Sequence, residues 1–233
     1  MASSRLRIAE IFASIQGEGI WAGTPSTFVR VSGCNLRCVW CDTPYASWAP
    51  EGPVLDLGEI LSAVEGHGIR HVVVTGGEPM LFDPIAELTG ELRRRGHVLT
   101  IETAGTIFRD LACDLMSVSP KLANSVPPEG SGWRERHEET RLQTDVLGAL
   151  VERYDHQLKF VVNPETGDDV PEIEALLHRL PPVRPERILL MPEGTDSDTL
   201  SRRQKLLVPV CMERGWRLSP RLHVDLFGNK RGT

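Results

Sequence analysis

The sequence lacks any apolar run close to the roughly 18 residues that a helix needs to cross a bilayer. Its first residues, Met1–Arg5, lack the apolar core of a secretion signal. Positive charge is not in excess either, because 26 Lys and Arg are outnumbered by 32 Asp and Glu, for a net charge of -6. These absences argue against a membrane protein, a secreted protein and a nonspecific nucleic-acid-binding surface. We therefore expect a cytoplasmic protein with no membrane and no nucleic-acid partner.

Cysteine is scarce, with five residues in a chain of 233. An odd count in a long chain argues against a disulfide framework and fits a reducing compartment. Cys113 and Cys211 lie in apolar surroundings, so we expect them to pack as small core residues. The other three, Cys34, Cys38 and Cys41, stand together with the spacing C-x3-C-x2-C.

This cysteine triplet is one ligand short of the common four-ligand metal sites. Structural zinc takes four ligands, and the closest histidine, His67, lies well downstream of the triplet. Iron–sulfur clusters that carry electrons use four cysteines. Three thiolates would instead leave one iron of a [4Fe-4S] cubane open to chemistry. The spacing favours such a cluster, and a zinc-binding, non-enzymatic module is the alternative.

Short β-branched runs alternate with amphipathic segments along the chain. The pattern predicts strands at 27–31, 71–75, 97–102, 115–119, 157–162 and 187–191. It predicts helices at 57–64, 84–95, 142–153, 170–180 and 199–214. The stretch 123–138 is rich in Pro, Gly and charge, so we expect an exposed loop there.

Strand–helix alternation predicts a parallel sheet with helical crossovers. About six such units fall short of the eight that close a TIM barrel. We expect an α/β fold, an open partial TIM-like barrel, in a single domain over 1–233. Parallel strands carry active sites at their carboxyl ends. Polar and special residues do follow the predicted strands, namely Cys34, Gly76–Pro79, Glu102, Thr103, Ser119–Lys121 and Met191–Glu193.

Two motifs together resemble the radical SAM superfamily. One is the cysteine triplet, and the other is Gly76-Gly77-Glu78-Pro79, directly after the strand 71–75. A lone Gly-Gly would indicate only a tight turn. In the superfamily, the open iron binds S-adenosylmethionine (SAM), and the reduced cluster cleaves SAM to a 5′-deoxyadenosyl radical. The Gly-Gly-Glu-Pro backbone there binds the amino group of the methionine moiety.

A narrower resemblance runs along nearly the whole chain, to the 7-carboxy-7-deazaguanine synthases of the 7-deazapurine (queuosine) pathway. The matching segments are Phe12–Gly19, Phe28–Leu36, Cys41–Thr43, Val74–Pro79, Ile101–Thr103, Ser119–Lys121 and Phe227–Gly232. The resemblance implies a lyase that converts 6-carboxy-5,6,7,8-tetrahydropterin into 7-carboxy-7-deazaguanine with loss of ammonia. It also implies catalytic use of SAM, Mg²⁺, a homodimer and a flavodoxin- or ferredoxin-type electron donor. Another radical SAM enzyme, such as a glycyl radical activating enzyme, is the alternative.

The resemblance implies roles for individual residues. The cluster ligands would be Cys34, Cys38 and Cys41, and the magnesium ligand Thr43. The substrate contacts would be Ile15, Gln16, Gly17, Arg30 and Thr75, with Glu102 and His223 as catalytic polar residues that reach the substrate. The SAM contacts would be Trp40, Cys41, Asp42, Gly77, Ser119, Pro120, Lys121, Met191, Pro192, Glu193 and Gly194.

Several of these residues also have an ordinary structural interpretation. Arg30 would then be an outward-facing strand residue, although its planar fork suits a substrate carboxylate better than lysine would. Asp42-Thr43-Pro44 would be a plain turn, although magnesium does prefer hard oxygen ligands. His223 would be a structural or surface histidine.

Overall fold

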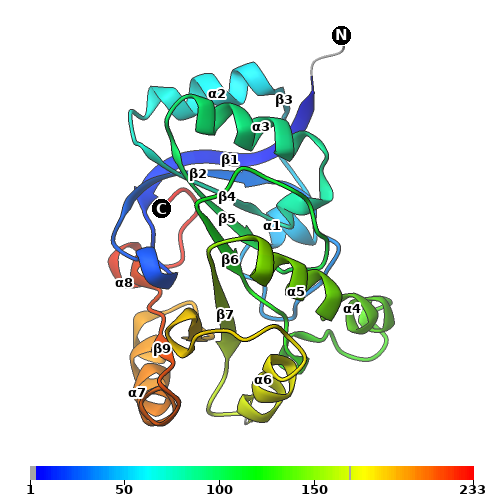
Figure 1. The fold of residues 1–233 in the computed structure, drawn as a ribbon, viewed down its shortest axis with the longest axis vertical. Coiled ribbons are helices and arrows are strands. Elements are labelled where there is room, and N and C mark those ends of the chain that lie inside the picture. Colours follow the sequence, from blue (N-terminus) through cyan, green and yellow to red (C-terminus); the bar gives the residue numbers. More distant parts are fainter. Residues whose placement is uncertain (1–3, 168) are drawn as a thin grey trace.

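In a computed structural model of the chain, which describes residues 4–167 and 169–233, nine strands form one sheet in the order β3-β1-β2-β4-β5-β6-β7-β8-β9 (Figure 1). The parallel strands are β2 (Pro25–Val31), β4 (His71–Gly76), β5 (Val98–Thr103), β6 (Leu115–Val118), β7 (His156–Val162), β8 (Ile188–Pro192) and β9 (Arg217–Leu218). Two strands are antiparallel, namely β1 (Arg5–Ile15) beside β2 and β3 (Val54–Asp56) beside β1. The edges of the sheet do not meet, so the expected open partial barrel is confirmed.

Five longer helices connect the strands and surround the sheet (Figure 1). They are α2 (Leu57–Gly66), α3 (Pro84–Arg94), α5 (Thr144–Arg153), α6 (Val170–Leu177) and α7 (Ser197–Arg214). Local sequence sets their ends: Asp56 and Glu59 form a capping box at the start of α2, and Gly215, at φ +67°, ends α7. In residues 4–167 and 169–233, none of the helices is long and apolar enough to cross a membrane.

The two faces of the sheet bury different residues. In β4, Val72 and Val74 join the main core under the helices, whereas Val73 packs on the opposite face with Phe12 and Phe28. Successive strand residues alternate between faces, so Thr75 shares the inner face with Val73. The aromatic rings of Phe12 and Phe28 stack there with centroids 5.0 Å apart. This inner face forms the apolar side of the candidate site.

The sequence pattern missed the short elements and the antiparallel edge. These are β1, β3, β9, the helices α1 (Pro44–Ser47), α4 (Arg134–Thr140) and α8 (Leu222–Phe227), and the 3-10 turns η1 (Gly19–Trp21), η2 (Pro79–Leu81), η3 (Ala123–Ser125) and η4 (Pro185–Arg187). Most are single turns or two- to three-residue strands, too short for periodicity to reveal.

The expected core positions of the two isolated cysteines are confirmed, since Cys211 is buried in the main core and Cys113 packs against it.

The prediction of an exposed loop over 123–138 is confirmed only in part: residues 126–133 form no helix or strand and 128–130 are exposed, but the rest of the segment is not an open loop. The segment contains η3 and the start of α4, and it buries Ser125 and His137. His137 accepts a hydrogen bond at Nδ1 from the backbone N–H of Arg37 (3.0 Å), and its Nε2 lies 3.0 Å from Ser125 Oγ. The guanidinium of Arg37 in turn stacks 4.0 Å above the Trp133 ring. Side chains of the segment find partners in the loop that carries Cys34, Cys38 and Cys41, which we call the cysteine loop. No local sequence pattern can show such contacts.

Candidate active site

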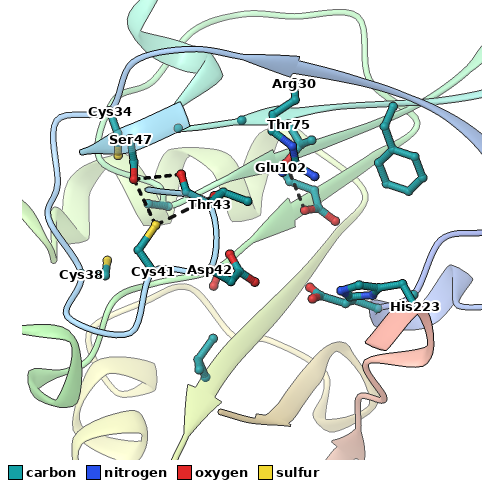
Figure 2. Close-up of a pocket in the computed structure, with 18 of the residues that line it drawn as sticks. Arg30, Cys34, Cys38, Cys41, Asp42, Thr43, Ser47, Thr75, Glu102 and His223 are labelled. Atoms are coloured by element: carbon teal, nitrogen blue, oxygen red, sulfur yellow. Dashed lines mark hydrogen bonds between the residues drawn. The ribbon is translucent and has the colours of Figure 1, made fainter. Parts of the chain in front are cut away.

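A cavity of about 490 Å³ lies at the carboxyl ends of the parallel strands, the edge at which the sequence predicts a site. Its volume falls in the range of small-molecule sites. Figure 2 shows two groups of side chains in it, with Cys34, Cys38 and Cys41 on one side and Arg30, Thr75, Glu102 and His223 on the other. Asp42 and Thr43 lie between the groups. We call the first group the cysteine side and the second the polar side.

On the cysteine side, all three thiols of the triplet line the cavity and none is in a disulfide. Burial raises the pKa of Cys34 to about 12 and that of Cys38 to about 11. Both groups are therefore protonated thiols at neutral pH, and binding to iron would displace their protons. Cys41 Sγ lies 3.0 Å from Ser47 Oγ of α1, which can donate a hydrogen bond to a thiolate.

The donor set fits a cluster better than a single ion. Within the described ranges 4–167 and 169–233, no three His, Cys, Asp or Glu side chains are grouped so that they could hold one metal ion. A cubane needs no such convergence, because each cysteine binds a different iron. Three thiols spread around one cavity, with no fourth beside them in that part of the chain, match a [4Fe-4S] site with one open iron.

The Gly76-Gly77 pair brings the end of β4 against the cysteine loop. A Cβ on Gly77 would lie 2.1 Å from the carbonyl oxygen of Gly33, the residue before Cys34, and Gly76 has φ +143°. Only glycine permits this approach. The next residue, Glu78, donates its backbone N–H to that same Gly33 oxygen at 2.8 Å. The two sequence motifs therefore meet in space.

Glu78 is fully buried and accepts three hydrogen bonds, from Met80 N (3.0 Å), Thr103 Oγ1 (2.8 Å) and Ala104 N (2.8 Å). Replacing Glu78 by alanine would leave these donors without a partner, at a cost of about 1–3 kcal/mol each. We expect Glu78→Ala to lower the free energy of unfolding by about 3 kcal/mol or more, measured by urea denaturation. Glu129→Ala, at an exposed position, is the control and should change it by less than about 0.5 kcal/mol. Equal effects of the two substitutions would contradict this role of Glu78.

On the polar side, Glu102 near the end of β5 is held by two residues from other segments. It accepts hydrogen bonds from Gln16 Nε2 (3.2 Å) and from Thr75 Oγ1 (3.3 Å). Gln16 follows β1 and Thr75 lies in β4, so three segments converge on one carboxylate. His223 of α8 packs directly on Gly17, where an added Cβ would lie 2.0 Å from its Nδ1. Burial lowers the pKa of His223, although Glu18 acts to raise it.

Arg30 points into the cavity rather than outward. Its Nε donates to Glu10 Oε1 at 2.6 Å, and Tyr45 donates its hydroxyl to the same oxygen at 2.6 Å. Burial alone would lower the pKa of Arg30, but Tyr45, Glu10 and Asp42 together raise it. Glu10 thus fixes the guanidinium through Nε. Among residues 4–167 and 169–233 its two terminal nitrogens have no hydrogen-bond partner, so both can contact a ligand.

Most of the expected site residues line this cavity, namely Ile15, Gln16, Gly17, Arg30, Cys34, Cys38, Trp40, Cys41, Asp42, Thr43, Thr75, Gly77, Glu102, Ser119, Lys121, Met191 and His223. Lys121 donates from Nζ to Ser119 O and Oγ, each at 2.7 Å, and lies 5.7 Å from the centre of the Trp40 ring. Four of the expected residues are not among those that line it, namely Pro120, Pro192, Glu193 and Gly194. The SAM contacts of all these residues stay predictions.

The sequence analysis missed a charge network at the wall of the cavity. Glu18 forms ion pairs with Lys159 and with Arg221, which also pairs with Asp42. Lys159 lies 3.7 Å from Glu102 Oε1, with its side chain 4% exposed. Burial alone would lower the pKa of Lys159, but Glu102 and Glu18 raise it, so Lys159 is charged. A lysine among the apolar residues Leu158–Val162 of β7 was the one available signal, because buried cations require partners.

Both motifs lie in a segment that matches a known protein family. The model of the radical SAM superfamily matches residues 28–124, which hold the cysteine triplet and Gly-Gly-Glu-Pro. A 7-carboxy-7-deazaguanine synthase of Halobacterium salinarum is 46% identical and covers 98% of this chain and 93% of its own. The enzyme of the same name from Rhodopirellula baltica is 42% identical, over 100% and 90% of the two chains.

The fold comparison agrees. The crystal structure of QueE from Escherichia coli aligns with a TM-score of 0.69 and 27% identity, covering 94% of this chain and 95% of that one. Identity over nearly full length, the two adjoining motifs and the shared fold point to one assignment. The chain belongs to the 7-carboxy-7-deazaguanine synthase family of radical SAM enzymes.

Proposed function

We propose that the enzyme converts 6-carboxy-5,6,7,8-tetrahydropterin into 7-carboxy-7-deazaguanine with loss of ammonia, using a [4Fe-4S] cluster, SAM and Mg²⁺. One observation carries the proposal, namely that a single cavity joins the cysteine side to a polar side able to hold a pterin carboxylate. The names of the full-length relatives support it. When bound, cluster and SAM supply a radical that removes a hydrogen atom from the substrate.

The polar side would bind and orient the substrate. Arg30 offers its free edge to the carboxylate, in the bidentate geometry that guanidinium groups favour. Gln16 provides a donor and an acceptor for the pterin edge. The stacked rings of Phe12 and Phe28 line the cavity and exclude water from one side of the substrate.

Glu102 and His223 are the proposed proton-handling groups. Glu102 lies in the cavity with Lys159 Nζ 3.7 Å from its Oε1. His223, with its lowered pKa, is neutral at neutral pH and can accept a proton from the substrate or return one. Loss of ammonia needs such transfers, because the leaving nitrogen must gain protons.

Thr43 is the proposed protein ligand of Mg²⁺, since it lines the cavity between the two sides and its Oγ1 lies 3.9 Å from Cys41 Sγ. Magnesium keeps several waters and substrate oxygens in its shell. We therefore expect Thr43→Ala to weaken the magnesium stimulation of turnover without abolishing turnover, and to leave SAM affinity nearly unchanged. Thr43→Ser keeps the hydroxyl and should behave like the parent. A parent-like magnesium response in Thr43→Ala would show that the ion binds elsewhere.

The remaining expectations also belong to this proposal. We propose that residues 1–233 act as one radical SAM core domain, that the enzyme is a homodimer and that a flavodoxin- or ferredoxin-type protein reduces the cluster. These proposals are supported by the family resemblance.

Anaerobic turnover tests the proposed function. The reconstituted enzyme is given SAM, dithionite, Mg²⁺ and carboxytetrahydropterin, and the products are identified by mass. Deazaguanine and ammonia in equal amounts are the expected result. Deoxyadenosine without any deazaguanine would point to a different radical SAM reaction. A colourless protein that binds zinc would point to the non-enzymatic alternative.

A further inference from the structure

Arg221 binds three separate segments of the chain at once. It lies directly before α8, two residues from His223, and its side chain is 7% exposed. Its Nε donates to Glu18 Oε1 at 3.2 Å, its Nη1 to the carbonyl oxygen of Gly194, and its Nη2 to Asp42. All three guanidinium nitrogens are therefore engaged, each with a different partner.

Each partner belongs to a segment that shapes the cavity. Asp42 follows Cys41 in the cysteine loop, Gly194 follows β8, and Glu18 follows the Gln16-Gly17 segment on the polar side. Arg221 itself lies behind the cavity wall, whereas Glu18 and Asp42 line it. Any effect of Arg221 on a ligand must therefore act through these neighbours.

Glu18 also extends the network to the polar side, because it pairs with Lys159, which reaches Glu102. Lys159, Arg221 and His223 hold the pKa of Glu18 well below its usual range, although burial alone would raise it. The charges alternate in sign from Glu102 through Lys159, Glu18 and Arg221 to Asp42. Burying them is costly unless every member is paired, which makes the geometry of the group sensitive to each member.

We propose that Arg221 is a positioning residue that holds the cysteine loop, the Gly194 loop and the Glu18 loop in register, so that SAM cleavage stays coupled to hydrogen abstraction from the substrate. The proposal deepens the proposed function and rests on it for its kinetic test. Lysine cannot replace Arg221, since one ammonium cannot reproduce three donors in a rigid planar fork.

The first test needs neither cluster nor substrate. Amide hydrogen exchange is measured on the cluster-free protein for peptides that contain Asp42, Glu18 and Gly194. We expect Arg221→Gln to speed exchange at least about tenfold in all three segments, because local opening sets the exchange rate. The control is Arg187→Gln, which also removes a carboxylate and a carbonyl contact, to Asp155 and His156, but near the opposite ends of β7 and β8. Unchanged exchange in the three segments would overturn the proposal.

The second test uses the reconstituted enzyme and measures the ratio of 5′-deoxyadenosine to deazaguanine formed. We expect Arg221→Gln to raise this ratio at least about tenfold, Arg221→Lys to raise it by less, and Arg187→Gln to leave it unchanged. A merely structural role would lower both products in proportion to the cluster-loaded fraction and keep the ratio constant. A constant ratio in Arg221→Gln therefore overturns the proposal.

The two tests separate this inference from the proposed function. If the parent enzyme makes no deazaguanine, the proposed function fails, and the exchange experiment still decides whether Arg221 orders the three loops. If Arg221→Gln does not fold, Arg221→Lys, which keeps the charge but not the three donors, takes its place in both experiments. It should speed exchange in the three segments and raise the product ratio, and either unchanged exchange or an unchanged ratio would overturn the proposal.

Discussion

Replacing Cys38 by alanine will abolish the reductive cleavage of SAM, with 5′-deoxyadenosine falling below detection. Cys38 lines the cavity with the other two thiols of the triplet. Its loss leaves only two cysteine ligands for the cluster, which needs all three. Cys38 is a small residue packed with Leu36 and Ala104, so alanine should preserve the fold. The measurement is deoxyadenosine formation with dithionite after anaerobic reconstitution, together with iron content and visible absorption.

Cys211→Ala is the matched control. Cys211 is also buried, but in the main core on α7 and away from the cavity. This variant should assemble the cluster and cleave SAM at the parent's rate. Deoxyadenosine formation by Cys38→Ala at that same rate would remove Cys38 from the ligand set.

Replacing Arg30 by lysine should weaken substrate binding by about 1–3 kcal/mol, the range for losing a charge-assisted contact, or roughly 5- to 150-fold in affinity. Lysine keeps the charge and can still pair with Glu10. It cannot pair with Glu10 and also offer a planar edge to a carboxylate. The measurement is substrate affinity by calorimetry, with SAM bound to the reconstituted protein.

Two further variants test whether a loss of substrate affinity in Arg30→Lys comes from the geometry of the guanidinium. Glu10→Gln removes the carboxylate charge but keeps an oxygen that can accept from Arg30 Nε, so it should weaken binding by a smaller factor than Arg30→Lys. Arg94→Lys, at an exposed position on α3, should have no effect. Substrate affinity in Arg30→Lys that equals the parent's would place the substrate carboxylate elsewhere in the cavity.

The parallel part of the fold follows from local sequence. Runs such as His71–Thr75 are apolar and β-branched because both faces of a parallel strand are buried. Signals such as Pro84 at the start of α3 and Gly215 after α7 mark helix ends with atoms that are close in sequence. All six predicted parallel strands and all five predicted helices are present for this reason.

A site residue could be predicted from the sequence wherever it follows a parallel strand. The carboxyl ends of such strands lie at one edge of the sheet, so the residues that follow them come together there. The charge network was not, since Glu18 and Arg221 are 203 positions apart and only the folded chain brings them together. The same holds for His137, whose partner Arg37 lies 100 positions away. Contacts of this kind leave no periodic trace in the sequence, so the 123–138 segment looked like an open loop.

The proposed function requires the cavity to place C6 of the carboxytetrahydropterin where a hydrogen atom is removed from it. The most direct measurement uses substrate with deuterium at C6, with SAM, dithionite and Mg²⁺, and follows the label by mass. If SAM is regenerated in each turnover, as we propose, deuterium is expected in the recovered SAM and in 5′-deoxyadenosine, together with formation of deazaguanine. Deazaguanine formed while SAM and deoxyadenosine stay free of deuterium would contradict it.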